Sequence, residues 1–111
     1  MAWLLRDGQV LASLEVAATA RARARGLLGR DGVEGALLLR PARSVHTLRM
    51  RFPIDVAFCD GDMVVVRVVT MVRNRIGRPV RLARCVIEAE AGTFAHWDLK
   101  PGDQLEVKGE D

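Results

Sequence analysis

Short apolar runs separated by turn residues form the main pattern along this 111-residue chain. The stretch 2–17 is predicted to form two strands joined at Asp7-Gly8, a residue pair that favours a tight hairpin turn. Later runs rich in apolar and β-branched residues predict further short strands. These lie at 35–42, 54–60, 63–72, 82–90 and, after a proline-glycine turn, within 100–107.

Two segments carry more specific expectations. The segment 44–50 is predicted to be extended, and it ends at Phe52 because a residue before proline is disfavoured in the helical region. The run 63–72 is interrupted only by Arg67 and is too continuous for a strand with one solvated face. We therefore expect the strand in 63–72 to be mostly buried.

Helical signals are few. Alanine and arginine favour a helix over about 18–28, with Thr19 as its N-cap and Gly26 near its end. One or two helical turns are also expected after Gly92. With about seven or eight strands, the pattern predicts a mainly β (α+β) fold. Residues 1–111 are expected to form a single compact domain, in which a curled, mostly antiparallel sheet or a barrel carries one or two short helices.

The charge pattern leaves two interpretations open. The chain has a net charge of +3, and its basic residues are mostly arginines in the first three quarters of the sequence. This asymmetry would suit an acidic partner. The alternative interpretation is that the chain uses arginine where lysine would serve equally well, without a function in binding. The three phenylalanines and two tryptophans do not interleave with arginines, so the pattern does not favour nucleic acid. The apolar runs are too short to span a membrane, and the N-terminus does not resemble a signal peptide, so we expect a cytoplasmic protein.

The cysteine pattern argues against a metal or cofactor. Cys59 and Cys85 form no CxxC pair and lie inside apolar strands, which favours buried free thiols over a disulfide or reactive pair. With His46 and His96 they would formally supply four zinc ligands, but no two have the spacing of a local ligand pair. The sequence also contains no recognisable nucleophile elbow, phosphate-binding loop or dinucleotide fingerprint. We therefore predict no cofactor and no metal.

Asp55 is the first candidate site residue. It alternates with Ile54 and Val56 in a predicted strand, and its own face has small or apolar neighbours. A buried carboxylate must be paired or hydrogen-bonded. The available partners are Arg25, Arg49 and Arg51, or backbone donors in the turn after Pro53. The carboxylate is then either a structural clip that holds the loop 49–53 or a group that orients a ligand.

Glu88 is the second buried carboxylate that the pattern suggests. It interrupts an apolar strand, and we expect that an interior Glu88 would need an arginine partner in a polar network shared with Asp55. His46 is either a ligand-contacting residue or a hydrogen-bonded residue of the partial core. The candidate binding residues are Arg25, His46, Arg49, Arg51, Asp55 and Glu88.

Several of these motifs also occur together in a known family. "RGLLGR" at 25–30, "SVHTLRMRFPIDVAF" at 44–58, "VIEAEAG" at 86–92 and "LKPGD" at 99–103 follow one another in this order. Together they resemble the bacterial and archaeal family called domain of unknown function 192, over about residues 16–107. The resemblance implies a small β-rich domain with little helix and no established activity.

The match to the family's central motif is partial. Pro53, Ile54 and Asp55 fit the motif, whereas His46 stands where the family usually has tryptophan and Arg49 where it has asparagine. Glu88 matches a glutamate in the family's later strand. The resemblance therefore includes the two carboxylates, Asp55 and Glu88, but does not imply a role for His46 or Arg49.

Two functions remain. The first is a non-enzymatic ligand-binding or protein-interaction module, in which the rim 46–53 and the loop 73–78 contact a small anionic molecule or a protein. The second is a small enzyme that uses Asp55 and Glu88, with Arg49, on an anionic small molecule. The absence of a recognisable nucleophile–base pair favours the first. The sequence does not specify the oligomeric state.

Overall fold

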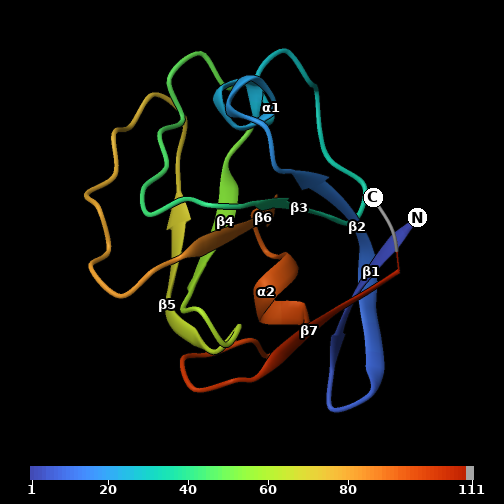
Figure 1. The fold of residues 1–111 in the computed structure, drawn as a ribbon. Coiled ribbons are helices and arrows are strands. Elements are labelled where there is room, and N and C mark those ends of the chain that lie inside the picture. The colour runs from blue at the N-terminus through green and yellow to red at the C-terminus, as the bar shows by residue number, and fades with distance from the viewer. Residues whose placement is uncertain (110–111) are drawn as a thin grey trace.

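The computed structural model describes residues 1–109 and contains one mixed sheet. Its strand order is β5-β4-β6-β3-β2-β1-β7, and β2 and β3 form the parallel pair among otherwise antiparallel neighbours (Figure 1). The strands within this part of the chain are β1 (Ala2–Arg6), β2 (Gln9–Ala17), β3 (Ala36–Leu39), β4 (Ile54–Cys59), β5 (Val65–Met71), β6 (Cys85–Glu90) and β7 (Leu105–Gly109). The mainly β prediction and the hairpin at Asp7-Gly8 are confirmed.

The sheet curls but does not close into a barrel. Its two outer strands, β5 and β7, are not paired along their lengths, and an isolated bridge between Val64 and Gln104 joins the segments that precede them. Of the two forms that the sequence left open, the curled, mostly antiparallel sheet is therefore the one observed.

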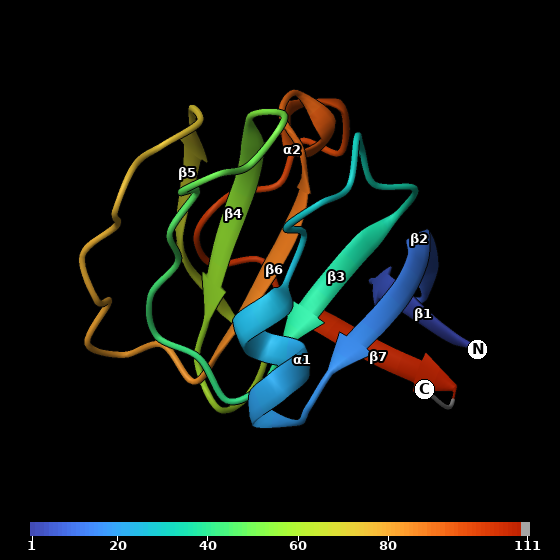
Figure 2. The ribbon, with the colours of Figure 1, turned by 90° about the horizontal axis from the view of Figure 1, so that it is seen from above.

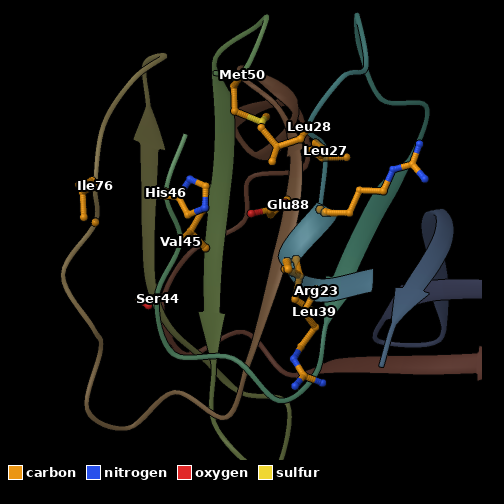
Figure 3. A pocket seen from close by; sticks show the side chains of 14 residues that line it. Arg23, Leu27, Leu28, Leu39, Ser44, Val45, His46, Met50, Ile76 and Glu88 are labelled. Atoms are coloured by element: carbon orange, nitrogen blue, oxygen red, sulfur yellow. The ribbon is translucent and has the colours of Figure 1, made fainter. Parts of the chain in front are cut away.

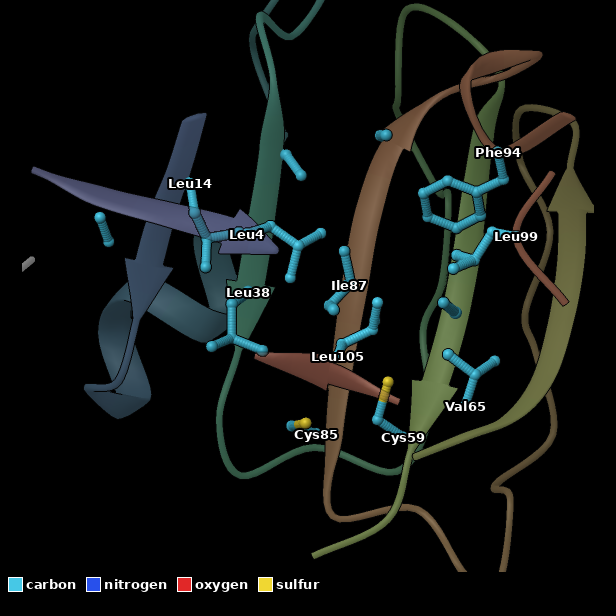
Figure 4. Close-up of a cluster of buried hydrophobic side chains, with 14 residues drawn as sticks. Leu4, Leu14, Leu38, Cys59, Val65, Cys85, Ile87, Phe94, Leu99 and Leu105 are labelled. Atoms are coloured by element: carbon cyan, nitrogen blue, oxygen red, sulfur yellow. The ribbon is translucent and has the colours of Figure 1, made fainter. Parts of the chain in front are cut away.

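The alternation of side chains along β4 and β6 divides the buried residues into two cores. The α2 core, inside the curl of the sheet, contains Phe94 of α2 together with side chains such as Leu4, Leu38, Ala57 and Ile87 (Figure 4). The α1 core, on the other face, contains Leu27, Leu37, Leu39, Val45, Met50, Phe52, Ile54, Val56, Phe58 and Val86 among others. Every residue of β4 is buried because both of its faces are covered.

The two helices are short and lie on different cores. In α1 (Ala20–Arg25), the Thr19 Oγ1 accepts a hydrogen bond from the Ala22 N–H at 3.1 Å, which confirms the predicted N-cap. Gly26, with φ of 48°, ends the helix three residues before the predicted boundary and is followed by the buried Leu27. The second helix, α2 (Thr93–His96), follows Gly92 as expected. Figure 2 shows α1 in front of β6 and β3. The loop that precedes β4 and the loop that follows β5 lie to one side of α1 in this view.

Two expectations about segments are wrong. Residues 44–50 form a loop, with an isolated bridge from His46 to Ile76, because the loop hydrogen bonds with the neighbouring segment 72–77 instead of entering the sheet. β5 is only partly buried, and Arg67 and Thr70 are exposed. The reason is that β5 lies at the edge of the sheet, where one side of the strand faces solvent.

Within residues 1–109, no helix has the length and apolar character needed to cross a membrane.

Candidate functional site

Asp55 lies in a compact cage of hydrogen-bond donors. Its Oδ2 accepts hydrogen bonds from the backbone N–H groups of Gly92 and Phe94, at 2.9 and 3.0 Å, and its Oδ1 accepts one from the Thr70 hydroxyl at 2.7 Å. The residue is 3% exposed. Main-chain donors thus partner the carboxylate, but they belong to the start of α2 and not to the turn after Pro53. Among the described residues, no arginine bonds to Asp55.

The structure separates Asp55 from Glu88. In the antiparallel ladder Glu88 is paired with Val56, and Asp55 is paired with Ala89. Paired residues share a face and successive residues alternate, so the two carboxylates lie on opposite faces of the sheet. The predicted shared network is not formed, and the two groups are not placed to act together on one substrate.

Glu88 faces a cavity between α1, the loop 44–50 and the sheet. The cavity has a volume of about 180 Å³. Figure 3 shows Glu88 entering it from β6, with Leu27 and Leu28 near one wall and His46 and Met50 near another. We call it the Glu88 cavity; it is lined by residues 23–28, Leu39, Ser44, Val45, His46, Met50, Ile76, Gly77 and Glu88.

The Glu88 carboxylate has no protein partner among residues 1–109. The residue is 4% exposed, and no hydrogen bond or ion pair joins its side chain to this part of the chain. Burial alone raises the pKa of Glu88 from its ordinary 4.5 to about 7. The predicted ion pair between Glu88 and an arginine is therefore not formed within the described residues. With a pKa of about 7, the carboxyl group is about half protonated near neutral pH.

Basic side chains line the Glu88 cavity. Arg25 and His46 are exposed and line it, and Arg25 makes no ion pair within the described chain. Arg23 also lines the cavity, but its guanidinium already donates hydrogen bonds to the Ala18 and Arg40 carbonyl oxygens at 2.8 and 3.3 Å. Arg25 is thus the lining arginine that is left available to a ligand.

The remaining predicted residues lie elsewhere. Arg51 forms an exposed ion pair with Asp31 at 2.8 Å, and the backbone N–H of Arg49 donates to the Asn74 side chain at 3.0 Å. Neither arginine lines the cavity. Of the six predicted residues, the structure brings Arg25, His46 and Glu88 together and leaves Arg49, Arg51 and Asp55 outside.

Thr47 fixes one wall of the cavity and was missed by sequence reasoning. Its hydroxyl donates to the Val72 carbonyl oxygen at 2.6 Å and accepts from the Arg75 N–H at 2.9 Å, while the side chain is fully buried. These bonds hold the loop 44–50, which carries His46 and Met50, against the segment 72–77. The one available signal was a hydroxyl residue between the apolar Val45 and Met50.

The cysteines belong to the opposite core. Cys59 and Cys85 are buried free thiols, as predicted, and face each other in the ladder between β4 and β6. Hydrogen bonding to Cys85 and burial both raise the pKa of Cys59, which keeps this thiol protonated. His46 lines the Glu88 cavity on the other face of the sheet, so the structure does not bring it to the thiols.

The fold and the cavity define a class of protein: a small α+β domain in which a short helix and two loops border a glutamate that has no partner among residues 1–109, on one face of a curled mixed sheet. The chain belongs to the DUF192 family, described as an uncharacterised ACR, whose model matches residues 2–107. This match confirms the resemblance seen in the sequence motifs.

Two solved structures share the fold. A protein of unknown function from Novosphingobium aromaticivorans is 22% identical, with a TM-score of 0.80 over 95% of this chain and 82% of that one. A protein from Sinorhizobium meliloti, provisionally named a transcription regulator, is 21% identical, with a TM-score of 0.81 over 96% of this chain and 91% of that one. No curated protein gives a significant match.

Proposed function

We propose that this domain is a non-enzymatic binding module that holds a small molecule in the Glu88 cavity. The observation that carries the proposal is the Glu88 carboxylate, which is buried, faces the cavity and has no partner within the described chain. Its oxygens are open to the cavity, since no fully buried side-chain oxygen of the described residues lacks a hydrogen-bond partner, and a carboxylate held largely away from bulk water is stabilised by hydrogen-bond donors beside it. A ligand in the cavity is placed to supply them.

The energetics support a site that is completed by a ligand. Raising the pKa of Glu88 from 4.5 to about 7 corresponds to a destabilisation of about 3 kcal/mol once the group is ionised. A fold stabilised by only ~5–15 kcal/mol loses a substantial fraction of its stability to such a residue. Binding that supplies donors to the ionised group recovers part of this loss.

The size and lining of the cavity suit a small ligand. Its volume of about 180 Å³ is similar to that of an apolar cavity of ~150 Å³ that accepts benzene. Most of its walls are apolar, and the exposed residues Arg25 and His46 also line it, of which Arg25 carries a positive charge. The positive charge of Arg25 supports the anionic character expected for part of the ligand.

Geometry favours binding over the enzyme alternative. An enzyme that used Asp55 and Glu88 together would need both carboxylates on one side of the sheet, and they lie on opposite faces. The Asp55 carboxylate is also fully occupied by Thr70 and the start of α2.

We further propose a cytoplasmic location, which cell fractionation would test.

The test is a thermal-shift screen with small organic molecules of up to about ten non-hydrogen atoms, since a ligand that prefers the native state raises the midpoint. Leu28→Trp fills the cavity, and Leu82→Trp adds the same side chain at a residue that is 64% exposed. We expect some compounds to raise the Tm of the wild type and of L82W but not of L28W. Hits that stabilise L28W as strongly as the wild type, or no hits at all, would contradict the proposal.

A further inference from the structure

The deepest polar group of the Glu88 cavity sets the chemistry of the ligand's inner end. An ionised carboxylate only accepts hydrogen bonds, so its missing partner must be a donor. Within the described chain the donor is not supplied by Arg23, which is bonded to Ala18 and Arg40. A charged donor forms the stronger bond and also neutralises the buried charge. A primary ammonium group satisfies both needs.

The walls set the middle of the ligand. Leu27, Leu39, Val45 and Met50 are buried side chains that line the cavity, and Leu28 and Ile76 complete its apolar surface. These side chains offer no hydrogen bonds, so they favour a hydrocarbon segment. The volume of about 180 Å³ limits this segment to a few carbon atoms.

The exposed lining residues set the outer end. Arg25 and His46 are exposed, line the same cavity and carry the donors that an anionic group would contact. Glu88 is the single acidic residue of the lining, so no second carboxylate repels an anion at this end. The charges thus run from negative at the buried end to positive at the exposed end.

Resting on the proposed binding function, we infer that the ligand is a compact amphoteric molecule: an ammonium group on a short hydrocarbon chain that ends in a carboxylate or a similar anion. The ammonium group pairs with Glu88 and the anion with Arg25. The shared cavity, its apolar walls and the opposite charges at its two ends carry this inference together.

Matched probes test the inference by isothermal titration. The probes are 4-aminobutanoate, 5-aminopentanoate and 6-aminohexanoate, with pentanoate and pentylamine as compounds that each lack one charged end. We expect the best amino acid of the series to bind about tenfold or more tightly than pentanoate and pentylamine, because each lost charge-assisted bond weakens binding by about this factor.

Two variants assign the ends. Glu88→Gln is expected to weaken 5-aminopentanoate and pentylamine about tenfold and to leave pentanoate unchanged. Arg25→Gln is expected to weaken 5-aminopentanoate and pentanoate and to leave pentylamine unchanged. Arg21→Gln is the matched control, since Arg21 is an exposed residue of α1 that does not line the cavity.

The pH dependence gives a second readout. Affinity for pentylamine is expected to rise between pH 6 and 8 as Glu88 ionises, and E88Q is expected to abolish this rise. Arg23, Arg25 and His46 also face the cavity and are kept in E88Q, so any dependence due to them would persist in the variant.

The outcomes separate the inference from the function on which it rests. Equal binding of pentanoate, pentylamine and the amino acids, all lost in L28W, would keep the binding module and overturn the charge assignment. Tighter binding of pentanoate than of pentylamine, increasing at low pH, would overturn it as well, because Glu88 would then act as a protonated donor. A screen without ligands of any kind would overturn both.

Discussion

Two buried carboxylates on neighbouring strands show how far a residue's surroundings determine its role. Asp55 is satisfied by three donors, and Glu88, on the other face, has none among the described residues. Both are almost completely buried. Asp55 therefore stabilises the fold, whereas Glu88 lowers its stability when ionised. A destabilising polar residue that faces a cavity is the pattern expected of a binding group.

We predict that Glu88→Gln removes the contribution of this carboxyl group to the pH dependence of stability between pH 4.5 and 8. Because the folded pKa of about 7 exceeds the ordinary 4.5, the native state binds more protons than the unfolded chain in this range. The contribution of Glu88 to the free energy of unfolding is therefore most favourable below pH 4.5. About 3 kcal/mol of this contribution is lost as the pH rises through 7. Urea unfolding should find E88Q about 3 kcal/mol more stable relative to the wild type at pH 8 than at pH 4.5. Parallel pH profiles for the two proteins would show that Glu88 is not desolvated.

We predict that Asp55→Asn destabilises the domain by about 2 kcal/mol, because an NH₂ group replaces one carboxylate oxygen and cannot accept the bonds which that oxygen takes, either from α2 or from Thr70. Thermal unfolding should show a Tm lower by roughly 8 °C. Asp31→Asn is the matched control, since the Asp31 side chain is 90% exposed and its ion pair with Arg51 contributes little. An unchanged Tm for D55N would remove the structural role of Asp55.

At the level of elements, the connections decide where the cavity lies. The loop 44–50 precedes β4 and the segment 72–77 follows β5, and the hydrogen bonds of Thr47 join the two directly. The opposite wall comes from α1 and from the residues that follow it, Gly26 and Leu27. The cavity is thus bounded by segments that pack on the sheet without belonging to it, which makes its shape sensitive to the bonds of Thr47.

We predict that Thr47→Val destabilises the domain by about 1–3 kcal/mol, since it leaves the Arg75 N–H and Val72 carbonyl without the hydroxyl. Amide hydrogen exchange should accelerate for Asn74 and Arg75 more than for β4. Thr93→Val serves as the control because the Thr93 hydroxyl makes no hydrogen bond within residues 1–109. Unchanged exchange at Arg75 would show that Thr47 does not hold the loop.

Local signals made some elements predictable and hid others. Asp7-Gly8 and the Thr19 cap act on their immediate neighbours, so the hairpin and the start of α1 follow from the sequence. The two main-chain donors of Asp55 lie 37 and 39 residues away, at Gly92 and Phe94, and no local pattern indicates them. The placement of Asp55 and Glu88 on opposite faces depends on the register of β4 against β6, which alternation within one strand does not define.

At the scale of the whole molecule, the two cores carry the stability and the arginines lie outside them. The buried charged residues are Asp55 and Glu88, so none of the arginines of the described chain is buried. The four ion pairs that join described residues are all at least partly exposed. The net charge of +3 therefore affects solubility and partners more than it affects the fold.

We predict that Arg73→Ala changes the free energy of unfolding by less than about 0.5 kcal/mol, because Arg73 is exposed and forms no ion pair with residues 1–109. Urea unfolding at low and at high salt is the measurement. A loss of more than 1 kcal/mol would mean that the loop 73–78 has a structural contact beyond those described.

The pairing of β1 with β7 has a consequence for the order in which the chain can fold during synthesis. Ala2 lies opposite Gly109 in this pairing, so the outer edge of the first hairpin stays open until β7 has left the ribosome. In the meantime that edge offers free backbone groups to any other nascent chain. A chain truncated before residue 105 would keep the unpaired edge of β1 permanently. Such a chain is expected to aggregate rather than to form a smaller soluble domain.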